Sequence, residues 1–189
     1  PISAQSPYAA TKIAADQLSL SYYKSFNLPV KIIRPFNTFG PRQSLRAVIP
    51  TIVSQFIKNK KTIIRVGNLK ATRDFLYVED LCSAYEKVFK SKKLFGEVVN
   101  VGSNFEVSVE EIVRKISKLQ KKKYKIISEK KRIRPIRSEV SRLRCNNTKI
   151  KRLTKWKPRY SFEQGLKNLI NWLSRDYNLN KFKINKYNI

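Results

Sequence analysis

The run Ser-Pro-Tyr-Ala-Ala-Thr-Lys at residues 6–12 is the most informative feature of this sequence. Ser6 has a side chain suited to the N-cap position and Pro7 is favoured as the first helical residue, so a helix is predicted to begin here. Apolar residues follow at helical spacing to about Phe26, which predicts an amphipathic helix. Asn27 and the proline that follows shortly after it mark the end of this helix.

A strand and a polar loop follow the helix. Residues 30–33 read as a short buried strand, and residues 34–42, Arg-Pro-Phe-Asn-Thr-Phe-Gly-Pro-Arg, as the loop beyond its carboxyl end. Ligands of open α/β sheets bind beyond the carboxyl ends of strands. Helix and strand patterns then alternate along the chain, which predicts an α/β fold. Helices are predicted at 48–58, 78–90, 109–119 and 147–153 and after Ser161, and strands at 62–66, 97–101 and 124–127. Ser108 with Glu111 and Ser161 with Gln164 are predicted to cap two of these helices.

Tyr8 and Lys12 stand four residues apart, so both side chains lie on one face of the predicted helix. A phenol has an ordinary pKa of about 10 and is a poor base near neutral pH. An ammonium group beside it favours the phenolate, which makes proton abstraction feasible. Tyr177 and Lys181 have the same spacing among residues that suggest no catalysis. The spacing alone is therefore weak evidence, and the surrounding sequence has to support it.

That context consists of short stretches that occur in a fixed order. They are residues 6–12, 34–42, 47–50 (AVIP), 73–80 (RDFLYVED), 100–102 (NVG), 134–135 (RP) and 156–158 (WKP). With them the chain resembles an extended short-chain dehydrogenase/reductase of the NAD-dependent nucleotide-sugar epimerase/dehydratase family. The resemblance spans most of residues 6–175, and residues 34–50 are most similar to UDP-N-acetylglucosamine 4,6-dehydratases.

The resemblance implies the C-terminal part of a Rossmann-type parallel sheet plus a smaller α/β substrate-binding region. Residues 1–42 would be the C-terminal portion of the NAD-binding Rossmann domain. Residues 43–189 would mostly form the nucleotide-sugar-binding region, with about 74–103 returning to the Rossmann sheet. The deduced enzyme would be cytoplasmic and a homodimer.

The resemblance also assigns residues to roles. Tyr8 and Lys12 would be catalytic and, with Pro35, would bind NAD. Asn37, Arg73 and Arg134 would bind the substrate, a UDP-sugar or similar nucleotide sugar. Without the family, Asn37 reads as a turn residue. Arg73 with Asp74 then reads as a surface ion pair, and Arg132 and Arg137 as solvated charges. Asp80 reads as a cap or support of its own helix.

The reaction implied by the resemblance is NAD-dependent 4,6-dehydration, a lyase reaction of surface polysaccharide or sugar biosynthesis. It would proceed by oxidation at C4, loss of water across C5 and C6, and reduction at C6. A nucleotide-sugar 4-epimerase of the same family shares every motif visible in this sequence. An acidic pair expected upstream of Pro1 would decide between the two, so both remain open.

Composition limits the chemistry further. The 189 residues include no histidine, which removes Ser-His-Asp and Cys-His systems and most zinc sites, and no metal is expected. The five glycines are too scattered to form a dinucleotide phosphate loop. Because methionine is also absent, we expect a fragment or a processed chain that is inactive alone.

The net charge of +28 raises an alternative from another class, a basic nucleic-acid-binding module. Twenty Lys and Arg residues fall between Arg114 and Arg159, against two glutamates. Lys122, inside the densest lysine run, is expected to be an exposed, solvated charge. No aromatic-interleaved recognition motif accompanies them, so we do not expect nucleic acid as the main partner. Cys82 and Cys145 are predicted to be buried small hydrophobes rather than a disulfide. No apolar run reaches transmembrane length, and no membrane association is expected.

Overall fold

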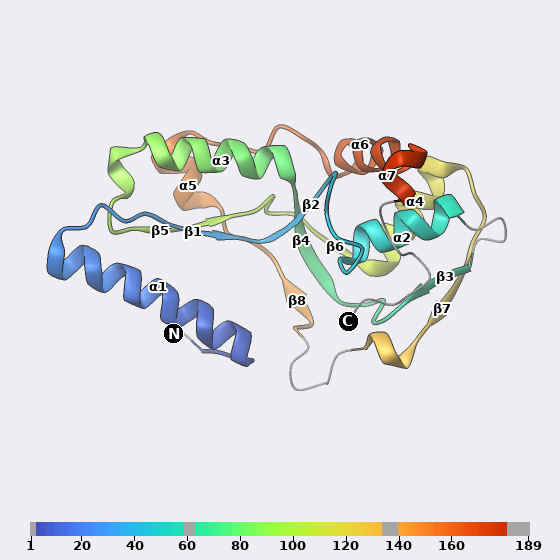
Figure 1. Ribbon diagram of the computed structural model, residues 1–189, viewed down its shortest axis with the longest axis horizontal. Coiled ribbons are helices and arrows are strands. Elements are labelled where there is room, and N and C mark those ends of the chain that lie inside the picture. The colour runs from blue at the N-terminus through green and yellow to red at the C-terminus, as the bar shows by residue number, and fades with distance from the viewer. Residues whose placement is uncertain (1–2, 59–62, 134–139, 181–189) are drawn as a thin grey trace.

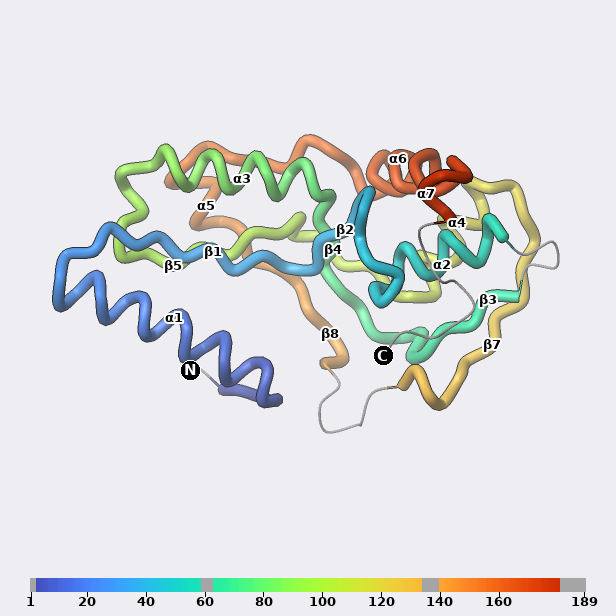
Figure 2. The backbone as a smooth tube through the Cα atoms, in the orientation of Figure 1, coloured from blue at the N-terminus to red at the C-terminus, as the bar shows by residue number. Residues whose placement is uncertain are grey.

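The computed structural model describes residues 3–58, 63–133 and 140–180, and these form an elongated molecule with two halves joined by a central sheet (Figure 1). Each half surrounds its own hydrophobic cluster. The path of the chain crosses between the halves several times (Figure 2). Residues that are distant in sequence therefore meet at the junction.

The first half contains two parallel strands with helices around them. β1 pairs with β5 in parallel, with Ile32 opposite Val98. The small core includes Val99, Val101 and Trp156, and the indole Nε1 of Trp156 donates to the Ser83 hydroxyl at 2.9 Å. The elements are α1 (Pro7–Phe26), β1 (Ile32–Pro35), α3 (Val78–Lys90), the short 3-10 helix η1 (Lys92–Leu94), β5 (Val98–Val101) and α5 (Thr148–Thr154).

The second half holds the larger core. The helices α2, α4 and α6 bury apolar faces against one another, and β3 pairs with β7 in parallel. Ile52, Phe56 and Ile112 are fully buried here. The elements are α2 (Val48–Lys58), β3 (Ile63–Val66), α4 (Val109–Gln120), β7 (Lys125–Ser128), the 3-10 helix η2 (Lys130–Arg132), α6 (Phe162–Leu173) and α7 (Asp176–Asn180).

A central sheet joins the halves. Its strands are β2 (Asn37–Phe39), β4 (Thr72–Tyr77), β6 (Glu106–Ser108) and β8 (Arg142–Leu143). β4 pairs with β2 and β8 in parallel and with β6 antiparallel. The long strand β4 runs directly into α3 of the first half, so it connects the two cores (Figure 1).

The predicted starts of α1, α4 and α6 are confirmed. The Ser6 hydroxyl accepts from the Ala9 amide at 3.2 Å, with Pro7 as the first helical residue. Ser108 with Glu111 and Ser161 with Gln164 form reciprocal capping boxes at the starts of α4 and α6. These caps satisfy backbone N–H groups that have no partner inside the helix.

Several predicted boundaries are wrong. The strand predicted at 30–33 is β1, which begins at Ile32 and ends at Pro35, because pairing with β5 sets its register. The stretch 34–42 is not all loop, since it contains the end of β1 and the whole of β2. The predicted strand 124–127 and helix 147–153 each lie one residue further along. β4, β6 and β8 were not predicted.

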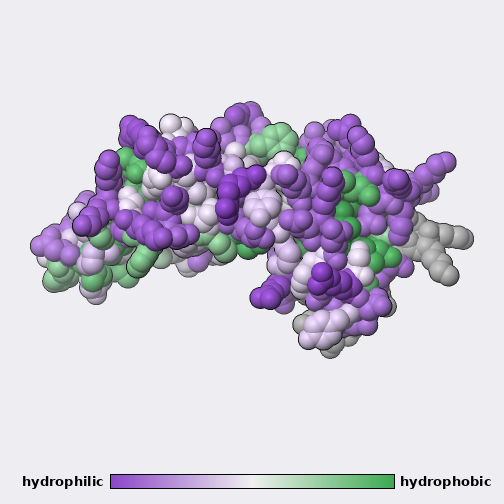
Figure 3. Space-filling model, turned by 90° about the horizontal axis from the view of Figure 1, so that it is seen from above, coloured by the Kyte–Doolittle hydropathy of each residue, from purple (hydrophilic) through white to green (hydrophobic). Residues whose placement is uncertain are grey.

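Two burial predictions are also wrong. The predicted amphipathic helix α1 buries none of its residues, and Leu18 and Phe26 are exposed. Apolar residues reach the surface at the left end in Figure 3, where α1 lies, among the hydrophilic residues that cover most of this face. Cys145 is buried as predicted, which raises the pKa of its thiol to about 12, but Cys82 is exposed. Both cysteines are unpaired, as expected.

Asp80 supports a distant loop rather than capping its own helix. Its carboxylate is fully buried and accepts from the amides of Arg159 (2.8 Å) and Tyr160 (3.1 Å). Asp80 thereby fixes the segment that leads into α6. Within the described ranges, no helix combines the length and the apolar character needed to cross a bilayer.

Candidate functional site

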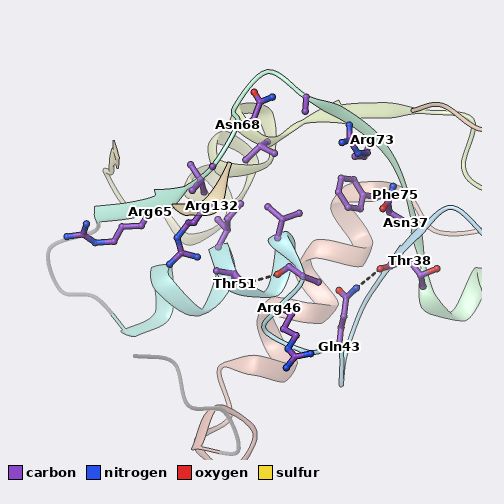
Figure 4. A pocket seen from close by; sticks show the side chains of 17 residues that line it. Asn37, Thr38, Gln43, Arg46, Thr51, Arg65, Asn68, Arg73, Phe75 and Arg132 are labelled. Carbon is purple, nitrogen blue, oxygen red and sulfur yellow. Dashed lines mark hydrogen bonds between the residues drawn. The ribbon is translucent and has the colours of Figure 1, made fainter. Parts of the chain in front are cut away.

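A cavity of about 430 Å³ lies in the second half, beside the central sheet (Figure 4). Its walls come from β2 and the loop after it, from α2, from the end of β3 with the turn that follows, from β4 and from η2. All of the polar side chains in these walls can donate hydrogen bonds, and the four arginines among them can only donate. The polar side chains are Asn37, Thr38, Gln43, Arg46, Thr51, Arg65, Asn68, Arg73 and Arg132.

Two residues predicted to bind substrate, Asn37 and Arg73, meet in this cavity although 36 positions separate them. Pairing of β2 with β4 places Asn37 opposite Phe75, two residues along β4 from Arg73. The Asn37 amide donates to the Asp74 carbonyl oxygen at 3.4 Å, and Arg73 Nη1 donates to the Thr72 carbonyl oxygen at 2.8 Å. In Figure 4 the side chains of Asn37 and Arg73 lie on the same side of the cavity.

Asp74 holds this part of β4 in place. Side chains alternate along a strand, so Arg73 and Phe75 line the cavity while Asp74 points the opposite way. Its fully buried carboxylate accepts from the amide and hydroxyl of Ser103 (2.8 and 2.7 Å) and from the amides of Asn104 (2.8 Å) and Cys145 (3.1 Å). The alternative of a surface ion pair between Arg73 and Asp74 is therefore wrong, because the Asp74 carboxylate is fully buried and bonded to other residues.

A second basic group stands elsewhere in the wall. Arg132 Nε donates to Glu129 Oε2 at 2.6 Å, and Arg65 Nη1 donates to Glu129 Oε1 at 3.0 Å. The hydrogen bond from Arg132, with a smaller contribution from Arg65, lowers the pKa of Glu129. Sequence reasoning missed this group, since Arg132 stood in a basic run and Arg65 in a predicted strand. Gly67, immediately after β3, was the one available sequence signal that another segment of backbone packs closely against this turn.

The predicted catalytic pair stands apart from the cavity. Tyr8 is 72% exposed, and the Nζ atom of Lys12 lies 5.5 Å from the centre of its ring, as expected for one helix face. An ion pair of 2.5 Å between Arg34 and Asp16 ties α1 to β1. The end of α1 that carries Tyr8 points toward the middle of the molecule in Figure 1. Pro35, the last residue of β1, is exposed.

Two further expectations concern basic residues. Arg134 lies outside the residues that the structure describes. Lys122, taken from the sequence as a solvated charge in the lysine run, is half-buried, and its Nζ donates to the Phe56 carbonyl oxygen at 2.6 Å. Among the described side chains, no cluster of three or more potential metal-ligating residues is present.

Comparison with known proteins identifies the family. A family model described as GDP-mannose 4,6 dehydratase matches residues 1–169. The human dTDP-D-glucose 4,6-dehydratase is 32% identical over 90% of this chain and 49% of its own length. The chain therefore belongs to the GDP-mannose 4,6 dehydratase family, and the predicted relationship to nucleotide-sugar epimerases and dehydratases is confirmed.

Solved structures agree. A dTDP-glucose 4,6-dehydratase from Bacillus anthracis in complex with NAD has a TM-score of 0.80 at 34% identity, covering 93% of this chain and 54% of that one. A UDP-glucuronic acid 4-epimerase from Bacillus cereus, with UDP-glucuronic acid and NAD, has a TM-score of 0.79 at 26% identity, covering 90% and 53%. The predicted α/β fold with part of a Rossmann-type parallel sheet is confirmed. The chain spans about half the length of these relatives.

Proposed function

We propose that the full-length protein is an NAD-dependent nucleotide-sugar 4,6-dehydratase that acts on a UDP-sugar such as UDP-N-acetylglucosamine. The observation that carries the proposal is the donor-rich cavity in which Asn37 and Arg73 meet. A nucleotide diphosphate offers only acceptor oxygens and negative charge at its centre, so donors of this kind are the matching lining.

Arg73 and Asn37 bind the diphosphate in this proposal. The guanidinium fork of Arg73 matches two phosphate oxygens, and the neighbouring Asn37 amide adds a neutral donor. Asp74 positions both groups. Its carboxylate fixes the strand from which Arg73 projects, and its own carbonyl oxygen accepts the hydrogen bond from the Asn37 side-chain amide. Arg134 remains proposed as a further phosphate ligand on the resemblance of its Arg-Pro motif.

Tyr8 accepts the proton of the sugar 4-hydroxyl, since it is exposed and has an ammonium group beside its ring. Lys12 binds the nicotinamide ribose, and Pro35 adds a contact at the end of β1. These residues fit the nicotinamide end of NAD; the scattered glycines supply no loop for its phosphates. When bound, NAD supplies the hydride acceptor that oxidation at C4 requires.

A 4-epimerase is the second candidate, and the similarity to a UDP-glucuronic acid 4-epimerase favours keeping it. Both reactions begin with the same proton transfer at the 4-hydroxyl, which is the step that Tyr8 and Lys12 serve. We further propose a cytoplasmic homodimer that contributes to polysaccharide or sugar biosynthesis.

Substitution of Arg73 tests the binding part of the proposal. We expect Arg73→Ala to weaken UDP binding by the full-length protein about ten- to a hundredfold, because it removes a charge-assisted hydrogen bond of about 1.5–3 kcal/mol. Lys123→Ala is the matched control, since Lys123 is exposed and lies outside the cavity. Lys122, in the same run of lysines, would not serve as a control, because its Nζ donates a hydrogen bond to the Phe56 carbonyl oxygen.

Titration calorimetry with UDP at physiological salt measures both variants. Equal weakening by Arg73→Ala and Lys123→Ala would indicate general electrostatic attraction and contradict a specific diphosphate site. Steep salt-dependent binding to duplex DNA, combined with no affinity for UDP, would favour the nucleic-acid alternative instead.

A further inference from the structure

Large aromatic side chains are exposed at the outer end of the first half, on α3 and just beyond it. One face of α3 buries Ala84 and Val88. Tyr85 and Phe89 lie one turn apart on another face and are 49% and 81% exposed. Phe95, directly after η1, is 39% exposed. This end of the molecule lies at the left in Figure 1, whereas the candidate cavity lies in the other half.

Lys31 holds the two phenylalanine rings together at this end. Its Nζ atom donates to the Phe89 carbonyl oxygen at 2.5 Å. The same atom lies 5.8 Å from the centre of the Phe89 ring and 4.3 Å from the centre of the Phe95 ring. An ammonium group over an aromatic face is attracted by the quadrupole of the ring. Two exposed rings and one positive charge therefore form a single surface feature.

Further lysines surround these rings, and the glutamates of the same segment are paired. The exposed lysines on α3 and η1 are Lys87, Lys90, Lys92 and Lys93. Residues 85–97 include two glutamates, of which Glu86 bonds Lys90 at 2.5 Å and Glu97 bonds Lys149 at 2.6 Å. Positive charge is therefore in excess around the rings, and a partner that covers them has to be negatively charged.

From this arrangement we infer that this end of the molecule docks on the surface of an anionic phospholipid bilayer. The docking surface, called the aromatic tip below, consists of Tyr85, Phe89, Phe95, Lys31, Lys87, Lys90, Lys92 and Lys93. The rings enter the boundary between headgroups and acyl chains, and the ammonium groups face the lipid phosphates. The expectation of no membrane association was based on the lack of a long apolar run, which a surface contact does not require.

The place of the aromatic tip favours a bilayer over single-stranded nucleic acid, the other polyanion that aromatic and basic side chains bind. Proteins bind such strands along a basic groove, with successive bases stacked on aromatic rings. The aromatic tip instead lies at one end of an elongated molecule, and Lys31 already stands over the two phenylalanine rings (Figure 1). A bilayer needs no groove, because apolar side chains and positive charge at a protruding end are sufficient.

Cosedimentation of the full-length protein with lipid vesicles, without nucleotide, tests the inference independently of the proposed function. Vesicles of equal parts phosphatidylglycerol and phosphatidylcholine should bind the wild type, and vesicles of phosphatidylcholine alone should not. Phe89→Ala combined with Phe95→Ala should weaken binding about tenfold or more, because the rings no longer enter the bilayer. Lys92→Glu combined with Lys93→Glu should weaken it at least as much, and binding should decrease as salt is added.

Two matched controls lie outside the aromatic tip. Phe105→Ala removes another exposed phenylalanine, between β5 and β6. Lys123→Glu combined with Lys125→Glu reverses two exposed lysines of the second half. Both controls should leave vesicle binding nearly unchanged. Phe89→Trp should bind like the wild type, since tryptophan is favoured at the membrane interface; circular dichroism of each variant checks that the fold is retained.

Three results would overturn the inference. The first is a wild type that does not bind the anionic vesicles, including one that binds single-stranded DNA or associates with itself through the two phenylalanines instead. The second is equal weakening by the two charge-reversed pairs with no effect of the phenylalanine substitutions, which would indicate general electrostatic attraction. The third is equal binding to both kinds of vesicle, which would deny the lysines a role.

Discussion

The two halves of the molecule present their proposed functional residues in opposite ways. Tyr8 and Lys12 project from α1, a helix of 20 residues of which none is buried. Asn37 and Arg73 project from strands whose neighbouring side chains, Phe39 and Phe75, are only 1% and 8% exposed. Local sequence signals are therefore enough to place the proposed catalytic pair on one helix face. The binding cavity depends on contacts between distant parts of the chain.

The largest expected effect separates chemistry from binding. In the full-length protein, Tyr8→Phe should lower kcat about a hundred- to ten-thousandfold, because it removes the group that accepts the proton. Its effect on UDP binding should be small, since Tyr8 lies outside the cavity. Steady-state kinetics with UDP-N-acetylglucosamine, and with other nucleotide sugars if that one is not turned over, measures the change.

Tyr177→Phe is the matched control, because Tyr177 is the other tyrosine with a lysine four residues on and is 75% exposed. It should leave kcat unchanged. If Tyr8→Phe instead weakens UDP binding and leaves kcat intact, Tyr8 belongs to the binding region, and the contrast between the two halves disappears.

A stability measurement tests the other side of the comparison. Asp74→Ala should lower the free energy of unfolding by about 3 kcal/mol or more, since it leaves buried N–H groups and the Ser103 hydroxyl without their acceptor. UDP binding should weaken as well, because Arg73 loses the support of its strand. Urea unfolding followed by circular dichroism measures the first effect. Asp176→Asn is the control and should leave the free energy of unfolding unchanged, because Asp176 is exposed. A similar loss of stability in both variants would mean that Asp74 does not hold β4 in place.

The same contrast explains how much could be predicted. The bounds of α2 and α3 and the three serine caps were predicted from the sequence, because apolar spacing and capping chemistry are local. The short strands β6 and β8 could not be predicted in this way. Each gains its hydrogen bonds only by pairing with β4, which is distant in sequence.

The candidate site divides along the same line. Asn37 and Arg73 were identified because each stands in a family motif, and the structure brings them together. Arg132 could not be separated from its basic neighbours, since its place in the cavity wall depends on Glu129, Arg65 and the closeness of Gly67. The exposure of α1 could not be predicted either. Apolar spacing shows which face of a helix could pack, but not whether another element covers that face.

The smallest expected effect compares two caps of similar geometry in the two halves. The Ser6 and Ser108 hydroxyls accept amide hydrogen bonds of 3.2 and 3.1 Å, from Ala9 and Glu111. Ser108→Ala should lower global stability by about 1 kcal/mol, since α4 buries Ile112 and Ile116 in the larger core and cannot fray alone. Ser6→Ala should cost a similar amount locally but leave the urea midpoint unchanged, because α1 buries nothing and can open by itself. Hydrogen exchange should then be faster only in the first turns of α1. Equal shifts of the midpoint in both variants would mean that α1 unfolds together with the core, and the two halves would be one cooperative unit.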